Sequence, residues 1–279
     1  MAAPDVPRIG IFDSGIGGLS VLRALRRQMP QANITYLADT RYTPWGDRRA
    51  AWVVARSLQL STFLTAGGVD LVLIACNTAS TLAIGTLRAR WPEHLFVGVE
   101  PGIKPAAAAS QSGRIAVLGT SATLASARFG QLVEAHALNT TLLRLPCPGL
   151  ADAIEQAGAS PAADQRLETR LDAIAVTLAA AAVDTVVLAC THYPLVATAL
   201  AQRLGPGVAL VDTADAVVRQ VIKLLGRSAT DPAAGAAATQ LPNMPRLLGT
   251  GSREGLQRAA RRWIDPLAQP DQLDLPDPA

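Results

Sequence analysis

Two of the three cysteines stand at matching points of two similar segments, VDLVLIACNTAS at 69–80 and VDTVVLACTHYP at 183–194. In each segment an apolar run ends in an Ala-Cys pair, and small polar residues follow. A buried strand that ends at a cysteine places its thiol at the edge of a sheet where α/β proteins bind ligands. One cysteine alone is more often a small buried side chain. Two in matching contexts indicate that Cys76 and Cys190 share a function.

Two thiols that face each other across a cleft could form a disulfide, a metal site or an acid and base pair. His192 would complete a zinc set with Cys76 and Cys190. Against zinc, Cys-x-His places neighbouring ligands on opposite sides of an extended chain, and the sequence has no second close pair. A redox pair usually has the spacing Cys-x-x-Cys, which is absent.

An acid and base pair fits the symmetry of the two segments. One thiolate would remove a proton from one face of a carbon, and the opposite thiol would deliver a proton to the other face. The reference pKa of cysteine, about 8.5, keeps thiol and thiolate both accessible near neutral pH. Inversion of a stereocentre requires such a pair, because the two enantiomers exchange the roles of acid and base.

A glycine-rich turn, FDSGIGGLS at 12–20, leads from a predicted strand into a predicted helix that begins near Leu19. Free N–H groups at the start of a helix can hold an anion. The spacing is not the dinucleotide fingerprint Gly-x-Gly-x-x-Gly, and no phosphate-loop lysine follows. A carboxylate is therefore a better candidate ligand here than a nucleotide.

Apolar runs of strand length alternate with segments of helical spacing, which predicts an α/β fold with mainly parallel sheets. The predicted strands lie at 8–12, 32–39, 70–75, 95–100, 114–119, 139–145, 184–189 and 208–212. The helical segments between them include 19–29, 50–67 and 167–181, and a further helix is expected at 253–264.

The paired segments predict two pseudo-symmetric α/β lobes that face each other across a cleft. The first lobe would comprise residues 1–100 and 211–279, and the second residues 101–210. Residues 226–245 are rich in Ala, Gly, Pro and Thr and predict a flexible insertion. The last fifteen residues, 265–279, contain four prolines and four acids and predict a poorly ordered tail.

Composition argues against several classes of protein. The net charge is +3, but the basic residues are scattered and not interleaved with aromatics, so we expect no binding to nucleic acid. No apolar run approaches the roughly 20 residues that cross a bilayer, and the first residues do not form a secretory signal. We therefore expect a cytoplasmic protein with free thiols and no membrane partner. The residues do not specify an oligomeric state, and a homodimer stays open.

Six motifs in order and spacing resemble the glutamate racemases of the cofactor-independent aspartate/glutamate racemase family. They are FDSGIGGLSV, YLADTRYTPWGDR, ACNTAS, GVEPGIKPA, VLGTSAT and LACTHYPL. The similarity runs from about residue 8 to 225, and TGSREGLQRAARRWI at 250–264 resembles the Thr-Gly and helix that close the family's chain.

The resemblance implies an enzyme that interconverts L- and D-glutamate with two cysteines, without cofactor or metal, and supplies D-glutamate for peptidoglycan. By family analogy Cys190 deprotonates L-glutamate and Cys76 deprotonates D-glutamate. Asp13 and His192 would each tune a nearby thiol. The lysines Lys104 and Lys223 do not suit a pyridoxal phosphate Schiff base, in keeping with the absence of a cofactor.

The resemblance also implies which residues hold the amino and carboxylate groups of glutamate. They are Ser14, the backbone of Pro44, Trp45 and Gly46, and the polar residues Asn77, Thr78, Thr120, Thr123 and Thr191. Asp39 and Glu155 stand where the family has further acids near its site. The chain departs from the family at Trp45, where tyrosine is usual, at 41–43 and at Phe129.

Several of these residues also have purely structural interpretations. Asp13 could cap a helix, since aspartate favours that place. Thr120 and Thr123 could cap the helix after the strand at 114–119, and Asp39 and Glu155 could be surface acids. For the whole chain, the alternatives are a racemase for aspartate or a hydantoin, a two-lobed protein that binds an acidic metabolite, and a zinc hydrolase. Cys147 has no matching partner and is expected to be structural.

Overall fold

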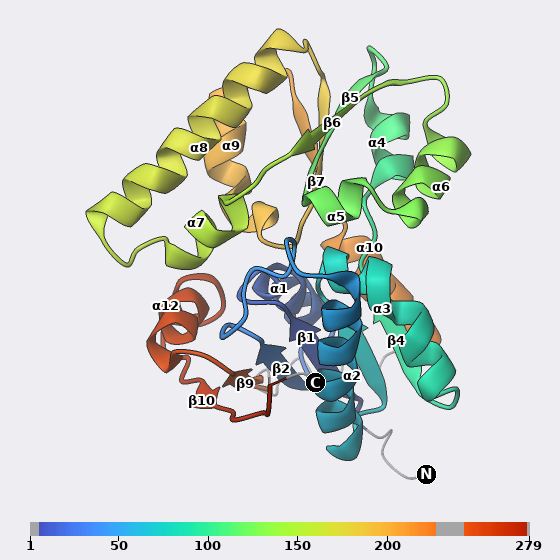
Figure 1. Cartoon of the computed structure of the whole chain (residues 1–279), viewed down its shortest axis with the longest axis vertical. Helices are drawn as coiled ribbons and strands as arrows, with labels where there is room; N and C mark the ends of the chain where they lie inside the picture. Colours follow the sequence, from blue (N-terminus) through green and yellow to red (C-terminus); the bar gives the residue numbers. More distant parts are fainter. Residues whose placement is uncertain (1–5, 227–242, 278–279) are drawn as a thin grey trace.

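The computed structural model describes residues 6–226 and 243–277, which form two α/β lobes stacked end to end (Figure 1). The first lobe contains a six-stranded sheet in the order β10-β9-β2-β1-β3-β4, and the second a four-stranded sheet in the order β6-β5-β7-β8. Every strand pairing among the described residues is parallel. The predicted α/β class with mainly parallel sheets is thus confirmed.

The strands of the first sheet are β1 (Arg8–Asp13), β2 (Asn33–Ala38), β3 (Leu71–Ile74), β4 (Leu95–Gly98), β9 (Arg246–Gly249) and β10 (Asp271–Gln272). The first four coincide with predicted strands because each is a run of apolar residues buried on both faces. The last two were not predicted, because β9 has only two apolar residues and β10 none.

The strands of the second sheet are β5 (Arg114–Gly119), β6 (Thr141–Pro146), β7 (Thr185–Ala189) and β8 (Ala209–Val211). All four coincide with predicted strands. The central strands β5 and β7 are buried along almost their whole length, whereas β6 lies at an edge and is only partly buried.

Helices cover both faces of the first sheet. One face packs against α1 (Leu19–Gln28), α10 (Ala214–Leu224) and α12 (Arg253–Trp263), and the other against α2 (Ala50–Ala66) and α3 (Asn77–Arg90). Side-chain alternation along β1 divides the two cores: Ile9 and Ile11 join the cluster on α1, and Phe12 joins the cluster on α2 and α3.

The second sheet is covered in the same way (Figure 1). One face packs against α7 (Leu150–Gln156), α8 (Pro161–Ala180) and α9 (Ala197–Leu204), and the other against α4 (Ile103–Ala109) and α6 (Ala127–His136). Two short elements, α5 (Ser121–Leu124) and the 3-10 helix η1 (Tyr193–Val196), lie at the carboxyl ends of β5 and β7. Both therefore lie on the side of the sheet that faces the first lobe.

Two segments carry the chain between the lobes, one after β4 and one after β8. One continuous cluster of buried apolar residues includes side chains of both lobes. Polar contacts also join them: Thr78 Oγ1 lies 3.2 Å from Thr120 Oγ1, and Ser20 Oγ donates to the carbonyl of Thr191 at 3.0 Å. Within the described residues, the search for a helix of sufficient length and apolarity to span a bilayer found none.

The C-terminal segment differs from its prediction. Residues 265–279 were expected to form a poorly ordered tail, but β10 pairs with β9, and Leu273 and Leu275 pack on the core beside α2. The physical reason is that two leucines in a polar segment find an apolar surface that the sequence pattern does not show. Most of the predicted insertion at 226–245, residues 227–242, lies outside the described residues.

Candidate active site

A narrow cavity of about 20 Å³ lies where the carboxyl ends of the two sheets meet. It takes residues from both lobes, because strands β1 and β3 and strands β5 and β7 end on either side of it. Its lining residues are Ser14, Pro44, Trp45, Gly46, Cys76, Asn77, Thr78, Thr120, Ala151, Cys190, Thr191 and His192. The structure therefore brings most of the predicted site residues together, and adds Ala151.

Cys76 lies between β3 and α3 and caps the helix. Its sulfur accepts the N–H of Ala79 at 3.5 Å and lies 3.7 Å from the hydroxyl of Ser14. Burial, together with the charge of Asp13, raises the pKa of Cys76 to about 12. At neutral pH Cys76 is therefore a thiol, ready to give a proton.

Cys190 lies on the opposite lobe, directly after β7. Its sulfur is 3.7 Å from Nδ1 of His192, and Nε2 of His192 is 2.7 Å from a carboxylate oxygen of Glu155. Burial lowers the pKa of His192, but its contacts with Cys190 and Glu155 outweigh burial and hold that pKa well above its usual value. The ring of His192 therefore lies between the Cys190 sulfur and the Glu155 carboxylate.

Glu155 orients His192 but does not line the cavity. The same oxygen that contacts His192 also accepts the N–H of Ile16 at 2.8 Å and the hydroxyl of Thr43 at 3.3 Å. These contacts join α7 of the second lobe to the glycine-rich turn of the first. Glu155 is therefore placed as a positioning residue, not as a surface acid.

The glycine-rich turn passes very close to these side chains. A Cβ atom at Gly15 would lie 1.9 Å from Oε1 of Glu155, and one at Gly17 would lie 2.3 Å from Nδ1 of His192. Neither position can carry a side chain without displacing the pair. The glycines thus provide the room in which Glu155 and His192 meet.

The N–H groups of this turn are occupied by the protein's own carboxylates. Asp13 accepts from Gly18 at 2.8 Å and from Gly15 at 3.3 Å, and Glu155 accepts from Ile16. The N–H groups of Gly15, Ile16 and Gly18 are therefore paired within the protein, and the binding of a ligand's carboxylate by this turn stays a prediction. Asp13 thus holds the backbone at Gly18, directly before α1, and accepts the hydroxyl of Thr191, across the lobe boundary, at 3.5 Å.

Replacing Asp13 by asparagine is expected to stabilise the protein at neutral pH while lowering its activity. Burial raises the pKa of Asp13 from 3.8 to about 6, so the folded state binds this proton more tightly than the unfolded state. Stability is then lost as pH rises from about 4 to about 6, by about 3 kcal/mol in total. Asparagine resembles the protonated acid and avoids this loss.

The measurement is denaturant unfolding of both proteins at pH 4 and pH 8. We expect nearly equal unfolding free energies at pH 4 and a more stable Asp13→Asn protein at pH 8. A variant that is less stable than the wild type at pH 8 would show that the ionised carboxylate stabilises the fold.

The predicted threonines differ in their roles. Thr120 caps α5 by accepting the N–H of Thr123 at 3.2 Å, and its hydroxyl donates to that of Thr123 at 3.0 Å. Thr123 is fully buried and does not line the cavity, so it orients Thr120. Thr78 and Thr120 line the cavity from opposite lobes, within hydrogen-bonding distance of each other.

Trp45 forms part of the cavity wall and is held in place by residues that do not line the cavity. Its indole is almost fully buried and donates to Asp39 at 3.2 Å. Asp39 is fully buried but does not line the cavity; Arg56, also fully buried, holds both of its oxygens at 2.7 and 3.0 Å. Asp39 therefore supports the wall.

Sequence reasoning did not identify Thr43, Ala151 or Arg56 as residues of the site or its support. For Arg56 a signal existed: it is the only charged residue in the apolar segment 50–67. A lone charge on a buried helix face needs a partner of opposite charge. Thr43 and Ala151 carry no such signal, since their importance depends only on where the chain places them.

The other titratable groups do not extend the site. Among residues 6–226 and 243–277, no group of three or more His, Cys, Asp or Glu side chains is arranged to hold a metal ion. All three cysteines are free and buried. Cys147 is absent from the cavity wall, and burial raises its pKa to about 12.

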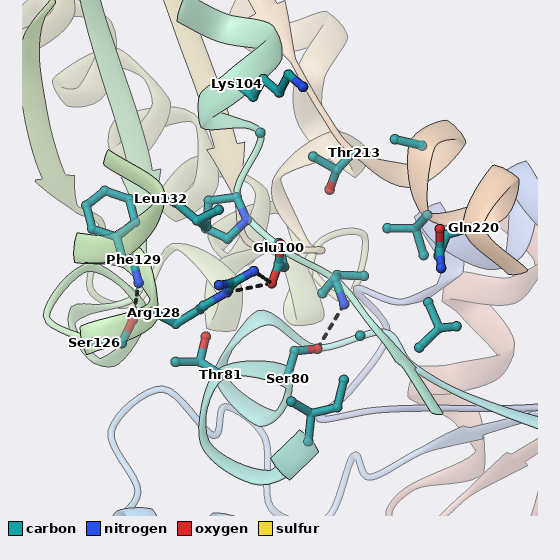
Figure 2. A pocket seen from close by; sticks show the side chains of 18 of the residues that line it. Ser80, Thr81, Glu100, Lys104, Ser126, Arg128, Phe129, Leu132, Thr213 and Gln220 are labelled. Atoms are coloured by element: carbon teal, nitrogen blue, oxygen red, sulfur yellow. Dashed lines mark hydrogen bonds and ion pairs between the residues drawn. The ribbon is translucent and has the colours of Figure 1, made fainter. Parts of the chain in front are cut away.

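A larger cavity of about 760 Å³ lies elsewhere between the lobes, beside the two connecting segments. Figure 2 shows Arg128 of α6 reaching Glu100, which follows β4; the two form an ion pair at 2.7 Å. Lys104, Thr213 and Gln220 also line this cavity. Neither Cys76 nor Cys190 contributes to its wall, so it is distinct from the thiol site.

Two α/β lobes with parallel sheets therefore meet at a narrow pocket that contains one thiol from each lobe. A family model described as Asp/Glu/Hydantoin racemase matches residues 18–221. The chain belongs to this family of enzymes.

Relatives with curated names agree with the family. The chain is 40% identical over 225 residues to a glutamate racemase of Pseudomonas syringae pv. tomato, covering 80% of each chain. It is 44% identical over 223 residues to a glutamate racemase of Herpetosiphon aurantiacus, covering 78% of this chain and 84% of the relative.

Solved structures share the fold over nearly the full length. A glutamate racemase isoform of Bacillus anthracis superposes with a TM-score of 0.80 at 26% identity, covering 98% of both chains. Escherichia coli glutamate racemase, solved with L-glutamate and the activator UDP-MurNAc-ala, superposes with a TM-score of 0.78 at 28% identity, covering 96% of this chain and 97% of that one.

Proposed function

We propose that this protein interconverts L- and D-glutamate, with Cys76 and Cys190 as the two proton-transfer groups. The observation that supports this most directly is that the two cysteines line one narrow cavity from opposite lobes. Relatives at about 40% identity are named glutamate racemases, and the similar structure from Escherichia coli holds L-glutamate.

In the L-to-D direction Cys190 is the base and Cys76 the acid. Cys190, acting as a thiolate, removes the Cα proton of L-glutamate and becomes a thiol. The Cys76 thiol then gives its proton to the opposite face and becomes a thiolate, so one proton is taken up and one released. In the reverse direction the two cysteines exchange roles.

The intermediate must be stabilised strongly, because the Cα proton of an amino acid is only weakly acidic. Turnover at about one event per second requires a barrier near ~17 kcal/mol. We assign this stabilisation to fixed dipoles in a site that excludes water. The polar residues of the wall hold the amino and carboxylate groups of glutamate: Ser14, Asn77, Thr78, Thr120, Thr191 and the backbone of Pro44, Trp45 and Gly46.

Substrate entry requires the pocket to widen. A cavity needs roughly 10–15 Å³ to hold one water, so the 20 Å³ in the structure is far too small for glutamate. The two connecting segments, after β4 and after β8, are the natural hinge about which the lobes part. The contact between Thr78 and Thr120 would open in this motion.

We also infer that the D-glutamate supplies peptidoglycan synthesis and that the protein acts in the cytoplasm. Family resemblance supports the first inference. The free, buried thiols support the second, since a reducing compartment keeps cysteines unpaired.

The proposed function is tested by the circular dichroism of L-glutamate incubated with purified protein and reductant, with no cofactor or metal added. We expect the signal to decay to zero, since the enantiomers have equal free energy in water. L-aspartate, incubated in parallel, is expected to keep its signal. Decay of the aspartate signal alone would identify aspartate as the substrate instead of glutamate. No decay of either signal would contradict the proposed function.

A further inference from the structure

The C-terminal segment 273–277 lies against the support of the cavity wall. Leu273 and Leu275 pack on the apolar cluster that contains Trp45 and the buried face of α2. The backbone of Leu273 also donates to the carbonyl of Gly249, which extends the pairing of β10 with β9. The segment is therefore held at a fixed place on the first lobe.

Beyond Leu275 the segment makes polar contacts with two residues near the wall. The carbonyl of Pro276 accepts from Nη1 of Arg56 at 2.8 Å, and the carboxylate of Asp277 accepts the hydroxyl of Tyr42. The ring of Tyr42 lies under the Arg56 guanidinium, 4.8 Å from its carbon. Gln59 bridges Arg56 and Asp277: its side chain accepts a hydrogen bond from Arg56 at 3.0 Å and donates one to the carbonyl of Asp277 at 3.4 Å.

Arg56 links the C-terminal segment to the wall of the cavity. Its Nε and Nη2 atoms hold Asp39, and Asp39 holds the indole of Trp45. A buried ion pair is favourable only when its remaining donors find partners, and the Pro276 carbonyl is one of two acceptors for Nη1 of Arg56. Three successive interactions therefore connect the C-terminal segment to a side chain that lines the cavity.

We propose that residues 273–277 are a positioning element of the substrate pocket, acting through Arg56 and Asp39 on Trp45. The proposal rests on the proposed function in one respect, namely that the cavity lined by Trp45 is the glutamate site. It goes beyond that function because it assigns a role in substrate binding to a segment far from the reacting carbon.

The test compares two truncated proteins. One ends at Leu275 and lacks Pro276 and Asp277; the matched control ends at Asp277 and retains every contact described above. We expect the shorter protein to have a KM about tenfold higher for both enantiomers, the effect of one charge-assisted hydrogen bond, with kcat changed by less than about twofold. The control is expected to match the full chain.

A second readout follows Trp45 without relying on activity. The chain has four tryptophans, so the ¹H–¹⁵N spectrum has four indole signals, and Trp45→Phe identifies the signal of Trp45. Loss of residues 276–279 is expected to shift this signal, while the remote Trp91 and Trp263 keep theirs. If the full chain does not racemise glutamate, the proposed function fails, and the Trp45 signal still decides whether the segment positions the wall.

Truncation at Leu275 creates a new carboxylate beside Arg56, so a full-length variant is measured with it. The double substitution Tyr42→Phe and Asp277→Ala removes both partners of the Tyr42–Asp277 hydrogen bond without changing the chain length. An unchanged Trp45 signal in both altered proteins would overturn the proposal. So would a shifted signal with an unchanged KM, since the segment would then position Trp45 with no consequence for the substrate.

Discussion

Replacement of either Cys76 or Cys190 by alanine is expected to reduce racemisation of glutamate by about 10⁴-fold, the upper end of what a general acid or base contributes. A general acid or base contributes 10²–10⁴-fold to a rate, and inversion needs one group on each face of the carbon. Among the described residues, Cys76 is the one acid or base that the first lobe contributes to the cavity wall, so its loss should not be compensated. The measurement is the decay of the circular dichroism of L-glutamate and, separately, of D-glutamate.

Unlike a wholly inactive protein, each single variant should still exchange the Cα hydrogen of one enantiomer of glutamate. In D₂O, a Cys76→Ala protein still has Cys190 to remove the proton of L-glutamate and return deuterium to the same face. We therefore expect deuterium in L-glutamate without formation of D-glutamate, and the opposite enantiomer preference for Cys190→Ala. Mass spectrometry of the recovered substrate measures this exchange.

The matched control is Cys147→Ala, which removes a buried thiol that does not line the cavity. It should keep most of the activity. Full activity in either Cys76→Ala or Cys190→Ala would contradict the two-cysteine mechanism. If, in addition, glutamate were bound but never inverted by the wild type, the two-lobed binding protein would be the better interpretation.

The second large effect is expected from His192→Asn, with a fall in kcat/KM of about 10²–10³-fold. This substitution removes the cation 3.7 Å from Cys190 and leaves Glu155 without its partner at 2.7 Å. Because the enantiomers have equal free energy, kcat/KM must fall equally in both directions. His192, whose pKa lies well above its usual value, no longer titrates in the variant, so the basic limb of the pH profile should change.

The pH profile separates this role from a purely structural one. A histidine that only packs in the core would lower kcat/KM through loss of folded protein and leave the shape of the profile unchanged. His136→Asn is the matched control, because His136 ends α6 and lies on the larger cavity, away from both thiols. A profile of His192→Asn identical in shape to the wild type would contradict the assigned role.

The strands could be predicted wherever burial on both faces requires an unbroken run of apolar residues. Strands such as β3 and β7 are buried throughout and consist almost entirely of apolar residues, because helices cover both of their faces. The strands β9 and β10 have no such run. They form because an existing sheet edge offers them hydrogen bonds, and a sheet edge is a property of the assembled lobe.

For the site, the sequence by itself determined the two thiols and the segments that carry them, because a strand that ends in a cysteine can be recognised locally. The tertiary structure decided which charges surround those thiols. In the folded chain Glu155 contacts His192, and the carboxylates of Asp13 and Glu155 accept the N–H groups of the glycine-rich turn. Asp39 does not line the cavity but binds Arg56 behind the wall. The contacts of Glu155 and Asp39 join residues from 17 to 139 positions apart. The free energy of such contacts depends on burial and distance, which only the folded chain defines.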